Sequence, residues 1–181
     1  MANEAKDREK EIGPFSGRAW KFGDNVPTDL IVPTSVVQSP MEIVLKHVMA
    51  ELNPEFPGSV KPGDVIVAGH HFGQSSGRAI ASKAILAAGV GCIVAESFAR
   101  TFLRNSYEVG LPLIECPGSA ELAKDGDVVY VDVVNGVVRN ETTGVTLKAR
   151  PIEPFLLTML KSGGIIPLVK KTGPDLGFKS V

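Results

Sequence analysis

The chain contains little cysteine and carries almost no net charge. Only two of its 181 residues are cysteines, and 19 basic residues nearly balance 20 acidic ones. Two cysteines do not make a disulfide framework, which favours a reducing compartment. The balanced charge excludes a general electrostatic attraction to nucleic acid or to acidic membranes. We therefore expect a cytoplasmic protein without a nucleic-acid partner.

Long apolar runs are also missing. The most apolar stretch, residues 84–95, is interrupted by two glycines and is too short to span a bilayer. The first twelve residues mix charges of both signs and lack the apolar segment of a secretory signal. We expect no membrane partner. The chain should have a flexible arm over residues 1–16, one domain over residues 17–168 and a tail over residues 169–181.

Short apolar runs alternate with segments of helical periodicity, which predicts βαβ units and a mainly parallel sheet flanked by helices. The predicted strands are 18–22, 30–32, 65–68, 93–95, 113–115, 128–134, 137–138 and 145–147, and the predicted helices are 41–52, 78–88, 98–108 and 154–162. Ser39 is the expected N-cap of the first helix. Asn135-Gly136 predicts a hairpin turn within a small β-rich C-terminal portion. The fold class is α/β, with Cys92 and Cys116 in apolar runs of the core.

The most informative segment is Gly69–Arg78, a glycine-rich turn between a predicted strand and a predicted helix. Such a turn directs backbone N–H groups and the positive end of a helix at one point. The phosphate-binding loop and the dinucleotide-binding fingerprint do not fit, because their glycine spacing and lysine are missing. The turn therefore indicates another kind of site for a negatively charged group.

The serines in this turn suggest two further interpretations, of which the first is excluded by the order of residues in the chain. Gly-Gln-Ser-Ser-Gly matches the nucleophile elbow of hydrolases, with Ser75 as nucleophile. That motif needs a later histidine, and all three histidines, His47, His70 and His71, precede Ser75. Alternatively, Ser75 or Ser76 simply caps the following helix.

Three blocks in order resemble the small subunit of 3-isopropylmalate dehydratase, the swivel domain of the aconitase superfamily. They are Gly17–Pro33 with its Gly-Asp-Asn-Val-Pro-Thr-Asp, Val60–Gly73 with its Lys-Pro-Gly-Asp-Val, and Ala88–Leu113 with its Glu-Ser-Phe-Ala-Arg. The resemblance covers most of residues 17–168 at family-like spacing. It implies a swivelling β/β/α domain there.

The resemblance also implies roles for individual residues. The family turn reads Phe-Gly-Cys-Gly-Ser-Ser-Arg-Glu-His-Ala, and aligned without a gap its first serine is Ser76 and its arginine is Arg78. Ser76 is then the catalytic base and Arg78 binds a substrate carboxylate. Asp29 matches an active-site aspartate of the family. Ser75, Gly77 and His71 are the remaining predicted substrate-binding residues.

Family enzymes use a 4Fe–4S cluster as Lewis acid, held by three cysteines, which this chain lacks. The resemblance therefore implies no cofactor or metal in this chain, a cluster on a separate large iron–sulfur subunit, and a small 2-hydroxy acid as substrate. The expected activity is that of a hydro-lyase, working only with the large subunit.

The sequence departs from the family at the site itself. Ser75 replaces a glycine, Gly77 replaces the second serine, and the loop 34–39 lacks the usual arginine. Two alternatives follow from these departures. One is a degenerate swivel domain that acts as a binding or regulatory module. The other is a relative that acts on a phosphorylated hydroxy acid or on hydroxyproline.

Overall fold

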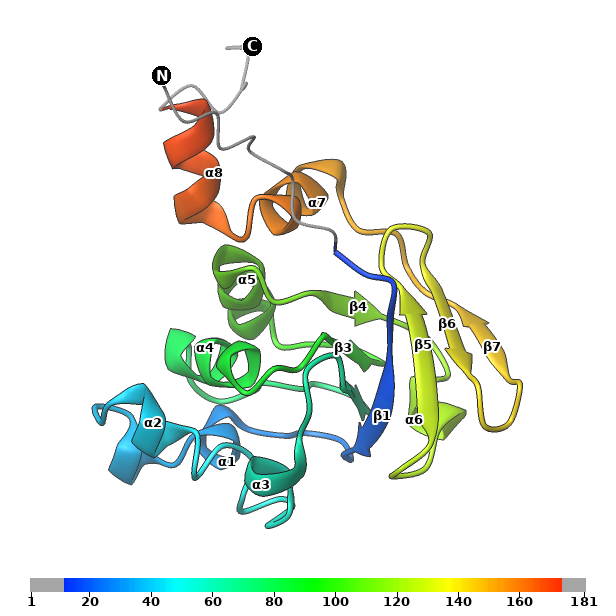
Figure 1. Cartoon of the computed structure of the whole chain (residues 1–181), viewed down its shortest axis with the longest axis horizontal. Helices are drawn as coiled ribbons and strands as arrows, with labels where there is room; N and C mark the ends of the chain where they lie inside the picture. The colour runs from blue at the N-terminus through cyan, green and yellow to red at the C-terminus, as the bar shows by residue number, and fades with distance from the viewer. Residues whose placement is uncertain (1–11, 174–181) are drawn as a thin grey trace, which may run out of the picture.

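In the computed structural model, which describes residues 12–173, the chain forms a seven-stranded sheet in the order β4-β3-β2-β1-β5-β6-β7 (Figure 1). The strands are β1 (Phe15–Lys21), β2 (Val65–Ala68), β3 (Cys92–Ala95), β4 (Leu113–Glu115), β5 (Val128–Asp132), β6 (Val137–Asn140) and β7 (Thr146–Lys148). Strands β1 to β4 are parallel, and β5 to β7 are antiparallel. The predicted α/β class with a β-rich C-terminal portion is confirmed.

β1 belongs to both halves of the sheet. Its last residues, Ala19–Lys21, pair with β2 in parallel, and its first residues, Phe15–Arg18, pair with β5 in antiparallel. The sheet can therefore curl between the parallel strands and the ribbon β5–β7 (Figure 1).

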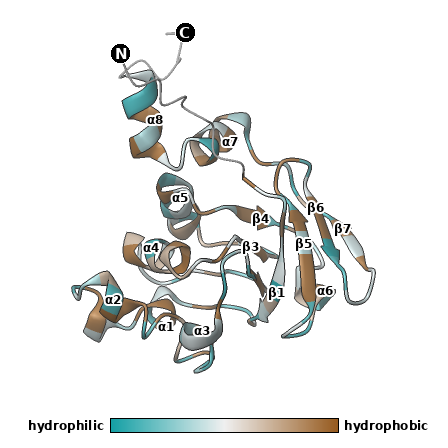
Figure 2. Cartoon of the chain, in the orientation of Figure 1, coloured by the Kyte–Doolittle hydropathy of each residue, from teal (hydrophilic) through white to brown (hydrophobic). Residues whose placement is uncertain are grey.

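The centre of the parallel half is covered on both faces. Every residue of β2 and β3 is buried, as their continuous apolar runs require, and β3 is brown in Figure 2. Helices α4 (Ala79–Ala87) and α5 (Arg100–Val109) lie on one side, while α6 (Ser119–Leu122) contacts β2 and β3 from the side of the antiparallel ribbon (Figure 1). The Ser82 and Ser106 hydroxyls, 2.8 Å apart, join α4 to α5.

The remaining helices lie at the two ends of the molecule. They are α1 (Thr28–Ile31), α2 (Met41–Val44), α3 (Phe56–Ser59), α7 (Pro154–Lys161) and α8 (Ile165–Thr172), with a 3-10 turn, η1, over Thr34–Val36. α7 and α8 pack against α5. Helix α8 was not predicted from the sequence.

The predicted strand 30–32 is wrong, because residues Thr28–Ile31 form α1. Their amides bond locally: Ile31 N–H donates to Pro27 and Val32 N–H donates to Thr28. Both edges of β1 are already paired with β2 and β5, so the sheet has no position for a strand here.

The predicted helix 41–52 is shorter than expected. It ends at Val44, and the chain continues in turns to residue 52. Met49 has φ +57°, and its amide donates to Ile31 instead of continuing a helix. The N-cap is Pro40 with no side-chain capping bond, so the prediction for Ser39 is also wrong.

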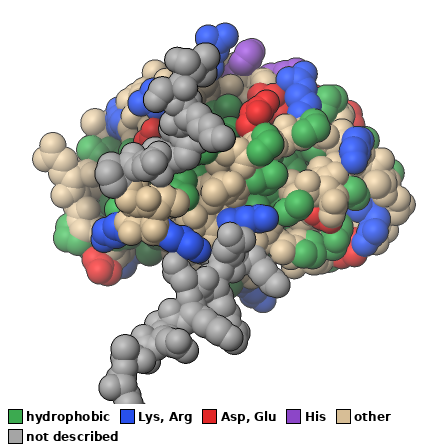
Figure 3. Space-filling model, turned by 90° about the horizontal axis from the view of Figure 1, so that it is seen from above, with side chains coloured by type: hydrophobic (Ala, Val, Ile, Leu, Met, Phe, Trp, Pro, Cys, Tyr) green, Lys and Arg blue, Asp and Glu red, His purple; other side chains and the backbone are tan. Residues whose placement is uncertain are grey.

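Several predictions concern the chain ends and surface. Residues 1–11 and 174–181 lie outside the described residues; Phe15 and Ser16 of the predicted arm belong to β1, and α8 crosses residue 168. The division into arm, domain and tail stays a prediction. Among the described helices, none has the length and apolarity to cross a membrane. Seen from above, acidic, basic and apolar side chains are interspersed (Figure 3).

Candidate active site after strand β2

The turn Gly69–Arg78 leaves β2 at the carboxyl end of the parallel strands and leads into α4. Loops that follow β1 and β3 meet it there. Pro27 forms a parallel bridge with Gln74, and Phe72 forms one with Phe98. In open α/β sheets this edge is where ligands usually bind.

Gly73 fits the turn where no other residue would. Its φ is +81°, a conformation that side chains disfavour, and an added Cβ would lie 2.1 Å from the Cγ of Phe102 in α5. The close approach brings the turn against the first part of α5. Gly77 likewise lies near α5, since its added Cβ would meet the Thr101 methyl at 2.8 Å.

Ser75 occupies an unfavourable backbone conformation. Its φ is +83°, at the position where the family pattern has glycine, and its side chain is exposed. A non-glycine residue in this region costs about 1–3 kcal/mol. The surrounding contacts must therefore hold the backbone in place.

Arg78 joins three neighbouring side chains through one guanidinium. Its Nε donates to the Ser76 hydroxyl at 3.1 Å, and its Nη1 donates to the Thr34 hydroxyl at 3.2 Å. Its Nη2 lies 2.6 Å from the Asp29 Oδ1. That carboxylate oxygen is buried and accepts no well-aligned hydrogen bond, so the contact with Arg78 is primarily an ion pair.

Arg78 is also the N-cap of α4, and no side chain caps that helix. The alternative interpretation, that Ser75 or Ser76 caps the helix, is therefore wrong. The Ser76 hydroxyl is free to face the guanidinium. The Arg78 side chain is 26% exposed and the Asp29 side chain is 45% exposed, so both reach the surface at this edge.

His71 lies in the same turn but has other neighbours. Its backbone has φ +56°, in the left-handed region. Its amide donates to the Ser97 hydroxyl at 3.0 Å, and its exposed ring lies 6.1 Å from that of His70. None of the contacts found for His71 involves Ser76 or Arg78.

Lys21 brings a further cation to this edge of the sheet. At the end of β1, its ammonium donates to the backbone oxygens of Ser119 and Ala120. Burial lowers the pKa of Lys21, while the negative charges of Glu121, Glu96 and Asp24 partly offset that effect. Lys21 thus holds the first two residues of α6.

The structure thus brings Ser76, Arg78 and Asp29 together, and it leaves Ser75 and Gly77 exposed on the same turn. Sequence reasoning missed Thr34, which contacts Arg78 from the loop where the family has an arginine. The only indication of this contact in the sequence was that Thr34 has a hydroxyl and lies in a loop without a cation.

The two thiols are free, buried and unsuited to bind metal. Burial raises the pKa of Cys92, and it raises that of Cys116 to about 11. Within residues 12–173 no three His, Cys, Asp or Glu side chains gather as a metal site. The described part of the chain therefore does not fit an iron–sulfur cluster.

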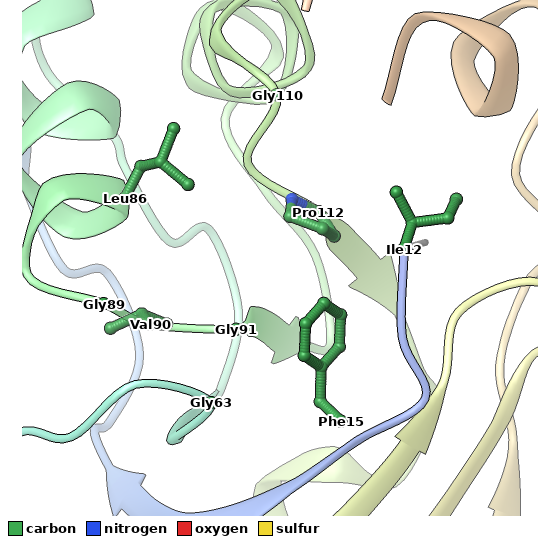
Figure 4. A pocket seen from close by; sticks show the side chains of 9 residues that line it. All are labelled: Ile12, Phe15, Gly63, Leu86, Gly89, Val90, Gly91, Gly110 and Pro112. Atoms are coloured by element: carbon green, nitrogen blue, oxygen red, sulfur yellow. The ribbon is translucent and has the colours of Figure 1, made fainter. Parts of the chain in front are cut away.

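A separate apolar hollow of about 250 Å³ lies at the amino ends of the parallel strands (Figure 4). Phe15, Leu86, Val90 and Pro112 line it with several glycines. It is at the opposite edge of the sheet from Ser76 and offers no charged side chain for a carboxylate. The candidate site is the exposed turn after β2.

Comparison with known proteins agrees with this architecture. A model of the aconitase C-terminal domain family matches residues 49–117. The chain is 47% identical over 160 residues to the protein named 3-isopropylmalate dehydratase small subunit 1 of Methanopyrus kandleri, covering 87% of this chain and 94% of that protein. It is 46% identical over 158 residues to the isopropylmalate/citramalate isomerase small subunit of Methanocaldococcus jannaschii, with the same coverage.

A solved structure shows the same fold. The crystal structure of 3-isopropylmalate dehydratase from Methanocaldococcus jannaschii superposes with a TM-score of 0.82 at 37% sequence identity. The match covers 87% of this chain and 94% of that one.

Proposed function

Because the chain belongs to the family of 3-isopropylmalate dehydratase small subunits, we propose that it supplies one half of the active site of an aconitase-type hydro-lyase. The substrate class is a small 2-hydroxy dicarboxylic acid, which is dehydrated to an alkene and rehydrated at the neighbouring carbon. The name of the Methanocaldococcus jannaschii relative contains both isopropylmalate and citramalate, which supports that class.

The observation that carries this proposal is the contact between Ser76 and Arg78. Ser76 Oγ is the base that takes the proton from the carbon next to a substrate carboxylate. A serine hydroxyl is a very weak base, so its alkoxide must be stabilised. The Arg78 Nε–H, 3.1 Å from Ser76 Oγ, is a donor already aimed at the oxygen where negative charge develops.

Arg78 has a second role in binding the substrate. Nη1 and Nη2 each carry a further N–H beyond those directed at Thr34 and Asp29. These N–H groups can hold a carboxylate by paired hydrogen bonds and so fix the C–H bond that is broken. Asp29 is an orienting partner of the guanidinium, consistent with the ion pair.

The hydroxyl group that leaves needs an electrophile, and the described residues offer none. A 4Fe–4S cluster on a partner large subunit would supply that Lewis acid. The exposure of Ser75 and Gly77 supports a site that a second chain covers and closes to water. Small and large subunits together then make the working enzyme.

The test is a reconstituted complex, made by coexpression with the iron–sulfur large subunit. We expect it to form an ultraviolet-absorbing alkene from 3-isopropylmalate or citramalate. Ser76→Ala should lower kcat by about 100-fold or more, since general-base catalysis contributes 10²–10⁴. Iron content and the elution volume of the complex should not change. Ser59→Ala, an exposed serine in α3, is the matched control.

The replacement of the second family serine by Gly77 favours one alternative, a regulatory module without catalysis. A complex that assembles with its cluster but forms no alkene from any hydroxy acid would support that alternative. Substantial activity in Ser76→Ala would refute the role of this serine while leaving the family intact.

A further inference from the structure

The buried Thr28 holds the turn that carries Ser76. Thr28 is the first residue of α1 and only 1% exposed. Its backbone N–H donates to the Gln74 oxygen at 2.9 Å. Its hydroxyl lies 3.3 Å from both the amide nitrogen and the carbonyl oxygen of Ser76. One side chain therefore accepts from the Ser76 N–H and donates to the Ser76 C=O.

These contacts flank the unfavourable conformation of Ser75. Gln74 and Ser76, the residues on either side, are both bonded to Thr28, while Ser75 has φ +83° and an exposed side chain. Among residues 12–173, no side-chain hydrogen bond was found for Ser75. The backbone at Ser75 is therefore held in place by the hydrogen bonds that its two neighbours, Gln74 and Ser76, make with Thr28.

The direction of the Ser76 hydroxyl depends on that backbone. Ser76 Oγ meets the Arg78 Nε only if the peptide at Ser76 keeps its orientation. Resting on the proposed function, we propose that Thr28 is a positioning residue: its hydroxyl fixes the Ser76 peptide so that Ser76 Oγ faces Arg78. Thr28 is buried and does not itself touch substrate.

A purely structural hydroxyl would affect folding and assembly, but not the chemical step in molecules that have assembled. A positioning hydroxyl affects kcat while KM stays nearly constant, because Arg78 still binds the carboxylate. It also affects the pH profile. When Ser76 Oγ moves from the guanidinium, its alkoxide is less stabilised, and the rising limb of kcat should move to higher pH.

The experiment compares Thr28→Val, which keeps the shape and loses the hydroxyl, with Thr28→Ser, which keeps the hydroxyl. In the complex with the large subunit, Thr28→Val should lower kcat about 10- to 100-fold, with KM within about threefold. Thr28→Ser should recover kcat to within about threefold of the parent. Amide hydrogen exchange at Ser76 should be faster in Thr28→Val, which is a readout independent of activity.

Ser75→Gly provides a second measurement. Glycine adopts φ +83° without strain, so the turn needs less help from Thr28. The loss of kcat caused by Thr28→Val should therefore be severalfold smaller when it is measured in the Ser75→Gly background than in the parent background. If Thr28→Val does not assemble, Thr28→Ser and Thr28→Cys are compared instead. These two side chains differ only in that the cysteine has sulfur, which forms weaker hydrogen bonds, where the serine has oxygen. Thr28→Cys should then be at least about fivefold slower than Thr28→Ser.

Two results would overturn the inference. The first is a Thr28→Val complex with the kcat of the parent, or a Thr28→Cys complex with the kcat of Thr28→Ser. The second is a loss of kcat in Thr28→Ser as large as that in Thr28→Val. The parallel Ser76→Ala measurement separates the two proposals. If Ser76→Ala abolishes turnover while Thr28→Val is fully active, only the role of Thr28 fails. If Ser76→Ala remains active, the proposed function of Ser76 fails as well.

Discussion

Small residues at defined backbone angles shape the turn after β2. Gly73 and Ser75 both have positive φ, and Gly77 lies against the Thr101 methyl of α5. Each of these features limits which side chains the turn accepts. The replacement of a family serine by Gly77 is consistent with this close packing, since a Cβ at that position would need Thr101 to move.

At the residue scale, Gly73→Ala should be strongly destabilising. The new Cβ would meet the Phe102 ring and sit at φ +81°. Strain and overpacking together should lower the free energy of unfolding by about 3 kcal/mol or more. Gly126→Ala is the matched control, because Gly126 has φ +90° and no atom within 4 Å of an added Cβ. Its cost should be about 1 kcal/mol. Equal losses in urea unfolding would contradict the close contact with Phe102.

At the scale of elements, α5 presents its first turn beside the candidate site. Thr101 is close to Gly77, and the Asn105 side-chain amide donates to the Gly77 oxygen at 3.0 Å. Arg100, which begins the helix, is exposed, and no ion pair was found for it among the described residues. Because the loop 34–39 has no cation and the Lys21 ammonium is bonded to α6, we expect α5 to offer the second cation.

Arg100→Gln should therefore weaken binding of a dicarboxylate. The loss of one charge-assisted hydrogen bond is worth about 1.5 kcal/mol, so KM should rise roughly tenfold with little change in kcat. Arg104→Gln is the control, since Arg104 lies one turn further on and pairs with Glu108 at 3.2 Å. Similar KM values for the two variants, measured in the complex, would exclude Arg100 from substrate binding.

The elements predicted well from the sequence are those whose own residues determine their burial. β2 and β3 are continuous apolar runs, and all their residues are buried. α1 and α2 were mispredicted because distant contacts, such as Met49 N–H to Ile31, decide their ends. α8 was missed because it contains Pro167. Proline is accepted in the first turn of a helix, because the amides of that turn have no hydrogen-bond partner within the helix.

The same distinction applies to the candidate site. Ser76, Arg78 and Asp29 could be grouped because the family resemblance aligned them, and the structure brings them together. The contacts of Thr28 and Thr34 join segments more than 40 residues apart in the chain. Thr28 lies in the Gly-Asp-Asn-Val-Pro-Thr-Asp block of the resemblance and Thr34 in no motif, but for both residues only the folded chain reveals these contacts.

At the scale of the whole molecule, β1 joins the two halves of the sheet and is followed by α1, which carries Asp29. Asp64, just before β2, holds β1 in register. Its carboxylate accepts the Trp20 indole N–H at 2.9 Å and the backbone amides of Lys61 at 2.9 Å and Arg18 at 3.1 Å. Asp64 is 5% exposed. This carboxylate thus fixes β1 relative to β2, and with it the helix α1 that carries Asp29 relative to the turn of Ser76.

Asp64→Ala should consequently be costly, because it leaves the buried Trp20 N–H and two amides without an acceptor. We expect the free energy of unfolding to fall by about 3 kcal/mol. Asp125→Ala is the control: it also contacts β1, through the Lys21 amide at 3.1 Å and the Arg18 guanidinium at 2.8 Å, but it is exposed. Its loss should be below about 1 kcal/mol. Urea unfolding of both variants with an unchanged m-value gives the comparison. A loss for Asp64→Ala no larger than that for Asp125→Ala would mean that backbone pairing alone sets the register, and that Asp64 does not link α1 to the turn of Ser76.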